Sequence, residues 1–369
     1  MLAKLKPLLC AAGGLLLAMS VSAAADHDIT IGAILPLTGP AAPIGLQEQQ
    51  GVTFAVDRAN ADGGVQGHKI KVLFEDSQGK PDQGVLAFNR LVDLNDVPAT
   101  LTAYSSISIA IAPLGTRREV LIINPAAQSD KLADASPFLF NTIPLVRDEA
   151  AVVARYALEK LGKKAAVIYE NAAAGIDGAE DFKKVFVEAG GEIITEEPVE
   201  FGQTNFRSVL LKVAAAKPDF VYISVTQGQE AFAEQVGQIP NFPVAVGNTF
   251  STPFFGYPST VGWYHTAIKS GITPELEAEF NEKFDTKEMG FFSREYFNST
   301  NILIQLIDHV LTAGKEVTGP NLRDALLEIK TFKSGIADIT FETNTAQREV
   351  EIMQHGEKER IKIDYTPSK

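Results

Sequence analysis

Segments of strand and helix character alternate along most of this chain, and this alternation restricts the fold more than any other feature. Apolar runs of strand length begin at Ile29, Lys69 and Val97, and a helical spacing of apolar residues follows each of them. The same strand-then-helix order returns between residues 148 and 249. Strands that alternate with helices predict βαβ units and a parallel sheet, and the doubled order predicts two similar α/β lobes.

The N-terminus and the charge predict an exported protein. Residues 1–25 carry Lys4 and Lys6, then an apolar run too short to span a membrane, and end in small residues, as in a signal peptide cleaved after Ala25. Without Lys4 and Lys6, the 33 basic residues become 31 against 46 acidic ones, a formal charge of −15. This acidic balance argues against nucleic acid and anionic membranes as partners. The single cysteine, Cys10, is expected to be removed with the signal peptide. The mature chain then has no disulfide, and its stability depends on its packed core.

The stretch from Val97 to Asp130 holds the first candidate binding site. Ser105 and Ser106 stand where a helix is expected to begin after a strand. A hydroxyl that faces outward there, together with the bare N–H groups at the positive end of the helix dipole, forms a site for an anion such as a carboxylate. The alternative is that Ser105 only caps the helix, and that Ala126 and Ala127 only form a tight turn after the next strand.

Other candidate residues also follow predicted strands. Ligands of open parallel sheets bind in a crevice at the carboxyl edge of the strands. The positions just past such ends are Ser105, Ala126, Asn171, Thr226 and Asn248.

Catalytic and metal-binding patterns are not recognisable in the sequence. The five histidines are dispersed and lack metal-ligand spacing, so each is expected to be a surface or structural residue. The acid pair formed by Glu48 and Asp57 fits a solvated helix face better than acid–base chemistry. We therefore expect a binding protein rather than an enzyme, with no metal and no cofactor.

Several segments together resemble a known family. They read ITIGAILPLTGP at residues 29–40, YSSISIAIAP at 104–113, INPAAQSD at 123–130 and YENAAAG at 169–175. In this order the chain resembles periplasmic solute-binding proteins of the leucine/isoleucine/valine-binding family, which serve ABC importers. The resemblance implies a type I periplasmic-binding fold, in which two doubly wound α/β lobes joined by three crossovers close on a ligand.

The resemblance also implies a division of the chain between the lobes. The first lobe is expected to hold residues 26–144 and about 266–333, and the second residues 145–265 and about 334–369. Independently of the family, residues 336–341 and 349–354 read as two antiparallel strands around a turn at 343–345.

At the positions where members of this family bind the ligand carboxylate, this chain has matching residues. The resemblance assigns Ser105 to the serine whose hydroxyl and backbone N–H bind that carboxylate, with Ser106 beside it. Ala126 and Ala127 correspond to the backbone turn below it. Asn171 and Thr226 also belong to the expected site.

At the positions where amino-acid binders of this family contact the ammonium of the ligand, this chain has different residues. Gln128 stands where amino-acid binders have threonine, Ala174 replaces a tyrosine, and Ile44 replaces an aromatic residue of the first loop. The acid that pairs the ammonium would fall near Asn248 or Thr249, and neither is charged. A buried ammonium without a partner costs several kcal/mol, so this pattern favours an aromatic or hydrophobic carboxylate, with aliphatic amino acids as the alternative.

Aromatic residues near the end of the predicted second lobe and in the last third fit either a ligand wall or ordinary core. They are Phe250, Phe254, Phe255, Tyr257, Phe291, Phe292, Tyr296 and Phe297. Glu230 and Glu295 are the acids expected to pair an amine if one is bound. The function implied is that of a monomeric periplasmic receptor which delivers a small carboxylate to membrane permease subunits. A ligand-sensing module for a signalling partner remains the alternative.

Overall fold

Two sheets, each covered by helices, organise the computed structural model, which describes residues 28–366. The predicted signal peptide and Cys10 lie outside the described residues. The first sheet has the order β2-β1-β3-β4-β5, and all of its pairs are parallel. Its strands are β1 (Ile29–Leu35), β2 (Ile70–Asp76), β3 (Ala99–Thr102), β4 (Leu121–Asn124) and β5 (Leu139–Asn141).

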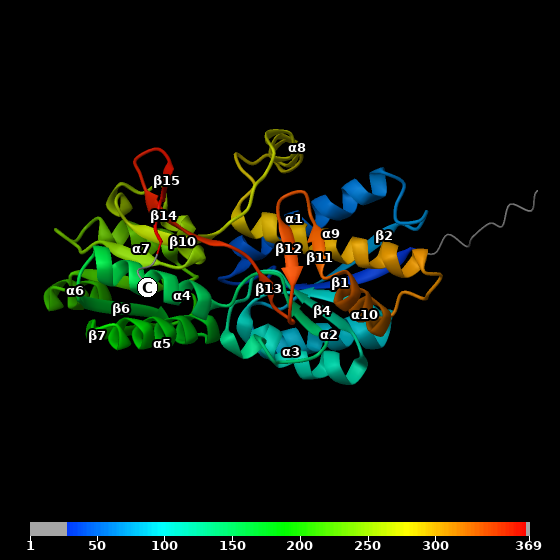
Figure 1. The fold of residues 1–369 in the computed structure, drawn as a ribbon, viewed down its shortest axis with the longest axis horizontal. Coiled ribbons are helices and arrows are strands. Elements are labelled where there is room, and N and C mark those ends of the chain that lie inside the picture. Colours follow the sequence, from blue (N-terminus) through cyan, green and yellow to red (C-terminus); the bar gives the residue numbers. More distant parts are fainter. Residues whose placement is uncertain (1–27, 367–369) are drawn as a thin grey trace, which may run out of the picture.

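Helices cover both faces of the first sheet, and this burial explains why its strands read as nearly continuous apolar runs. Ile31, Ala33 and Leu35 of β1 point to one face, whereas Ile34 points to the other. Helices on the first face are α1 (Ala42–Ala61), α9 (Phe291–Thr312) and α10 (Gly319–Ile329), and those on the second are α2 (Pro81–Asn95) and α3 (Ser105–Arg118). Figure 1 shows this layered lobe, with α8 (Pro274–Phe284) beside it.

The second sheet has the order β15-β14-β10-β9-β8-β6-β7. Its pairs from β7 to β10 are parallel, and β14 and β15 are added as antiparallel strands. The strands are β6 (Lys164–Glu170), β7 (Glu192–Val199), β8 (Phe220–Ser224), β9 (Ala245–Gly247), β10 (Tyr264–Ile268), β14 (Val350–His355) and β15 (Arg360–Ile363). The helices of this lobe are α4 (Val146–Lys160), α5 (Ala173–Glu188), α6 (Arg207–Ala216) and α7 (Gln229–Val236). Short 3-10 turns are η1 (Asp130–Leu132), η2 (Thr249–Phe254) and η3 (Pro258–Thr260).

The predicted two-lobed α/β class is confirmed, but the last third is arranged differently from the expectation. Residues 336–341 and 349–354 do not pair with each other. Strand β12 (Asp338–Phe341) lies between β11 (Thr331–Lys333) and β13 (Ala346–Gln347), whereas β14 pairs with β10 and β15. Ile339, Phe341 and Ala346 are buried in the core of the first lobe. Residues 334–347, which the sequence placed in the second lobe, therefore pack on the first.

The chain crosses between the lobes three times, after β5, after β10 and after β13. The second and third crossings lie together, because Lys269 N donates to Glu349 O at 2.9 Å and Arg348 Nη2 donates to Lys269 O at 3.1 Å. Arg348 also forms a buried ion pair with Glu295 of α9. These bonds hold the second and third connecting segments side by side.

Candidate functional site

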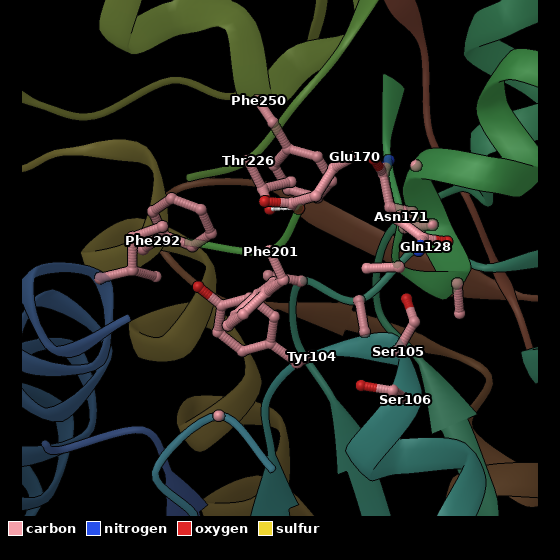
Figure 2. A pocket seen from close by; sticks show the side chains of 18 of the residues that line it. Tyr104, Ser105, Ser106, Gln128, Glu170, Asn171, Phe201, Thr226, Phe250 and Phe292 are labelled. Carbon is pink, nitrogen blue, oxygen red and sulfur yellow. Dashed lines mark hydrogen bonds between the residues drawn. The ribbon is translucent and has the colours of Figure 1, made fainter. Parts of the chain in front are cut away.

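A cleft of about 250 Å³ lies between the two lobes and receives residues from both. Nine of the residues expected from the sequence line it: Ile44, Ser105, Ser106, Ala126, Ala127, Gln128, Asn171, Ala174 and Thr226. The remaining lining residues are Glu48, Gly79, Tyr104, Glu170, Ala172, Ala173, Gly175, Phe201, Phe250 and Phe292. Figure 2 shows most of these side chains converging on the same space. That any of them contacts a ligand stays a prediction.

Ser105 is the first residue of α3, and its hydroxyl does not cap the helix. Tyr104 occupies the capping position with a positive φ (φ 63°, ψ 135°), and it makes no side-chain capping hydrogen bond. The Ser105 Oγ instead accepts a hydrogen bond from Ser129 N at 3.0 Å. The hydroxyl proton of Ser105 and the N–H groups of the first turn are thus left for a ligand, as an anion site at a helix N-terminus requires.

A second helix start also lines the cleft from the opposite lobe. Helix α5 begins at Ala173 directly after β6, again without a side-chain cap. Gly175 lets the helix approach the strand end, since a Cβ at this position would lie 2.2 Å from Glu170 O. The N-termini of α3 and α5 both favour negative charge, so the cleft has an electropositive side although none of its described lining residues is Lys, Arg or His.

The small-residue turn after β4 is partly occupied by internal bonds. Ala127 N donates to Asn124 Oδ1 at 2.9 Å, so this donor is not free for a ligand. The amide of Gln128 donates to Pro144 O at 3.1 Å and to Glu149 Oε1 at 2.5 Å. Gln128 therefore lines the cleft and at the same time fastens the first crossover to α4.

Asn248 and Thr249 do not line the cleft, contrary to the expectation. Both are buried, and Thr249 N donates to Glu149 Oε2 at 2.7 Å while Asn248 Oδ1 accepts from Phe250 N at 3.1 Å. These bonds start the turn η2 and direct the next side chain, Phe250, into the cleft. Asn248 and Thr249, assigned to the lost ammonium position, thus make structural bonds, and their neighbour Phe250 lines the cleft.

Four aromatic rings form one wall of the cleft: Tyr104, Phe201, Phe250 and Phe292. The Phe250 and Phe292 rings are parallel, with centroids 6.0 Å apart. Other aromatic residues of the predicted set do not line the cleft. Phe254 packs against Trp263 in the second core, and the Tyr296 hydroxyl is buried and donates to Thr102 O at 2.8 Å. Phe250 and Phe292 therefore line the cleft, where contact with a ligand stays a prediction, whereas Phe254 and Tyr296 belong to the core.

Two carboxyl groups also line the cleft, although the expected position of an acid, near Asn248 and Thr249, holds none. Glu48 is only 2 % exposed rather than solvated, and burial raises its pKa to about 8. Glu170 ends β6 and accepts from the Thr226 hydroxyl, and burial raises its pKa as well. The acids suggested earlier lie elsewhere: Glu295 pairs with Arg348, and Glu230 is exposed on α7.

Contacts across the cleft join the two lobes. The rings of Tyr104 and Phe201 meet edge-to-face with centroids 5.6 Å apart, and Gln227 Nε2 donates to the Tyr104 hydroxyl. Nearby, Asp177 of α5 accepts from the Ser129 hydroxyl and from Asp130 N, the latter at 3.1 Å. The structure thus describes the two lobes in contact over the cleft.

The described part of the chain lacks two features typical of other functions. Within residues 28–366, no group of three or more His, Cys, Asp or Glu side chains is arranged to hold a metal ion, and no helix is long and apolar enough to cross a membrane. The histidines are less dispersed than the sequence suggested, because His355 Nε2 and His265 Nδ1 lie 2.9 Å apart in the second lobe. Burial lowers the pKa of His355 to about 4, so this pair is neutral and structural.

Two lobes that meet over a cleft lined by helix N-termini are typical of ligand-capturing proteins. Sequence similarity identifies the protein family. The defining pattern of the periplasmic binding protein family matches residues 28–359. The chain belongs to this family, in its leucine/isoleucine/valine-binding branch. It is 30 % identical to the Leu/Ile/Val-binding protein homolog 2 of Brucella abortus, over 85 % of this chain and 86 % of that one. It is 33 % identical to homolog 3 of Brucella melitensis, but it spans only about half (55 %) of that relative's length.

Solved structures share the fold at lower sequence identity. A solute-binding protein of an ABC transporter from Rhodopseudomonas palustris, in complex with 3,4-dihydroxybenzoic acid, has a TM-score of 0.79 at 22 % identity and covers 89 % of this chain and 93 % of its own. The substrate-binding protein LivJ of Streptococcus pneumoniae, in complex with isoleucine, has a TM-score of 0.78 at 21 % identity, over 91 % and 99 %. These likenesses confirm the type I periplasmic-binding fold.

Proposed function

We propose that this protein is the periplasmic binding component of an ABC importer, and that it captures a small carboxylate between its lobes for delivery to permease subunits. The observation that carries the proposal is the uncapped N-terminus of α3, where Ser105 and the free N–H groups of the first turn border the cleft between the lobes. A carboxylate bound there replaces water as the partner of these donors, and the helix dipole stabilises its charge. The role is binding and release rather than catalysis.

The body of the ligand is aromatic or otherwise hydrophobic in this proposal. Tyr104, Phe201, Phe250 and Phe292 present rings to the cleft, and aromatic pairs contribute beyond the area that they bury. The cleft is smaller than the roughly 300–1,000 Å³ of sites for drug-sized ligands, so it suits an acid about the size of a benzoate. The Rhodopseudomonas neighbour is in complex with such an acid.

An aliphatic amino acid is the second candidate, and one observation favours it. The argument from the uncharged Asn248 and Thr249 no longer excludes an amine, because Glu170 brings a carboxyl group to the cleft. The relatives named for leucine, isoleucine and valine point the same way.

A thermal-shift panel on the purified mature protein tests the proposal, after partial unfolding has removed any ligand retained from the cell. A ligand that binds only the native state stabilises it by RT ln(1 + [L]/Kd), about 2.7 kcal/mol at a hundredfold excess over Kd. Benzoate-like and phenylpropanoid acids are expected to raise the melting temperature more than leucine, valine or phenylalanine. A larger shift with leucine and none with the aryl acids would favour the amino-acid candidate, and no shift with either group would contradict carboxylate capture.

A further inference from the structure

Two buried carboxyl oxygens in the cleft have no hydrogen-bond partner within the described part of the chain. They are Oε2 of Glu48, from the first lobe, and Oε1 of Glu170, from the second. Each side chain is 2 % exposed and lines the cleft. A buried polar atom without a partner is costly, and in native proteins such an atom calls for an explanation. One comes from each lobe, and both residues line the same cleft, so a molecule bound there is placed to complete their bonds.

The hydrogen bonds that Glu48 and Glu170 already make show which kind of partner each carboxyl group lacks. The Tyr296 hydroxyl has one proton, which it donates to Thr102 O, so its hydrogen bond with Glu48 is best made by a protonated Glu48. Glu170 accepts from the Thr226 hydroxyl and from the backbone N–H groups of Thr226 and Gln227. What both carboxyl groups lack is a further donor.

Glu170 lies apart from the anion site within the cleft. In Figure 2 the Ser105 and Ser106 hydroxyls lie on one side of the cleft, and the Tyr104 hydroxyl lies on the other. The carboxyl group of Glu170 lies beside Thr226, away from the two serines. Burial and the charges of Glu48 and Glu170 raise the pKa of Tyr104, as expected if both acids lie near its hydroxyl.

We propose that Glu48 and Glu170 form a second binding position, which takes a hydrogen-bond donor on the end of the ligand remote from its carboxylate. This inference rests on the proposed function and narrows its ligand class to acids with a distal hydroxyl or amino group, such as hydroxyaryl and aminoaryl carboxylates. The aromatic wall holds the ring between the two polar ends. The donor is remote from the carboxylate, unlike the α-ammonium of an amino acid.

Matched ligands test this position by calorimetric titration of the ligand-free, full mature protein. The probes are 4-hydroxybenzoate and 4-aminobenzoate, which carry a distal donor, and benzoate and 4-methylbenzoate, which do not. The donor-bearing acids are expected to bind at least about tenfold more tightly, because a site built around unpaired polar groups rejects an analogue that leaves them unpaired. Equal affinities for 4-hydroxybenzoate and 4-methylbenzoate would overturn the inference, and this comparison needs no mutant.

Two variants assign the effect to the residues. Glu48→Met and Glu170→Met keep the length of the side chain and remove the acceptors, so each is expected to reduce the preference for 4-hydroxybenzoate over 4-methylbenzoate several-fold. Ser105→Ala is the matched control, which should weaken all four acids alike and leave that preference unchanged.

The outcomes separate the two proposals. If none of the four acids binds, or if Ser105→Ala changes nothing, the proposed carboxylate site is wrong. If the acids bind through Ser105 without any preference for a distal donor, only the second binding position is wrong. A preference that survives both methionine variants would likewise refute the role of the two glutamates.

Discussion

Glu48 is expected to make the stability of the protein depend on pH. Burial raises its pKa from 4.5 to about 8 in the folded state, so the folded protein holds a proton that the unfolded chain releases. For a raised pKa, the stabilisation is complete below pH 4.5 and is lost as the pH rises through 8. The loss amounts to roughly 1.4 kcal/mol of unfolding free energy for each pH unit in this window, and to about 5 kcal/mol across it.

Glu48→Gln isolates this contribution, because glutamine resembles the protonated acid and can donate to the Tyr296 hydroxyl in the same way. Urea unfolding of both proteins at pH 5, 7 and 9, without ligand, measures the effect. The variant should gain stability relative to the wild type as the pH rises, by several kcal/mol between pH 5 and pH 9. Glu342→Gln, on an exposed side chain, is the control and should show a constant difference. A constant difference for Glu48→Gln as well would refute the inference of a buried, neutral carboxyl group.

Three further predictions concern the site and its frame. Ser105→Ala should weaken a carboxylate ligand by about 1.5–3 kcal/mol in calorimetric titration, and should also lower the melting temperature without ligand, because Ser129 N loses its acceptor; unchanged affinity would move the anion site elsewhere. X-ray scattering should show compaction when ligand binds, since the contact between Tyr104 and Phe201 closes the cleft, and identical curves at saturation would contradict hinge closure. Glu295→Gln should lower the unfolding free energy by about 3–5 kcal/mol in urea titration, because Arg348 is left buried without its partner, and a loss below about 1 kcal/mol would mean that the ion pair is dispensable.

The sequence predicted those parts of the site that depend on local order. Ser105 and Thr226 follow strands, and the ends of parallel strands meet at one edge of a sheet, so their place in the cleft follows from the βα rhythm. Glu170 satisfies the same rule as Asn171, directly beside it, and the rule could have found it. The family resemblance instead places an acid near Asn248 or Thr249, so it does not point to Glu170.

Other residues of the site depend on packing that a linear pattern does not contain. Glu48 lies on α1, a helix with buried residues on more than one side because it packs against α9 and also borders the cleft. Glu48 and Asp57 lie on opposite sides of α1, so the exposed position of Asp57 does not reveal that Glu48 is buried. Phe201 reaches the cleft from the loop after β7 and meets Tyr104 only when the lobes come together. The placement of residues 334–347 likewise rests on core contacts with residues distant in the chain.

The three crossings between the lobes have a consequence for how the chain folds. Asn141, at the end of β5, pairs with Thr345, and β10 pairs with β14, about 90 residues later. Neither lobe is thus built from one continuous stretch, because each includes residues from the last part of the chain. Contacts between residues so distant in sequence slow folding, because the entropy cost of closing a long loop comes before the stabilising contacts form. We expect the two lobes to complete their folding together, after the last part of the chain is available. A chain truncated before β12 is expected to leave both lobes incomplete.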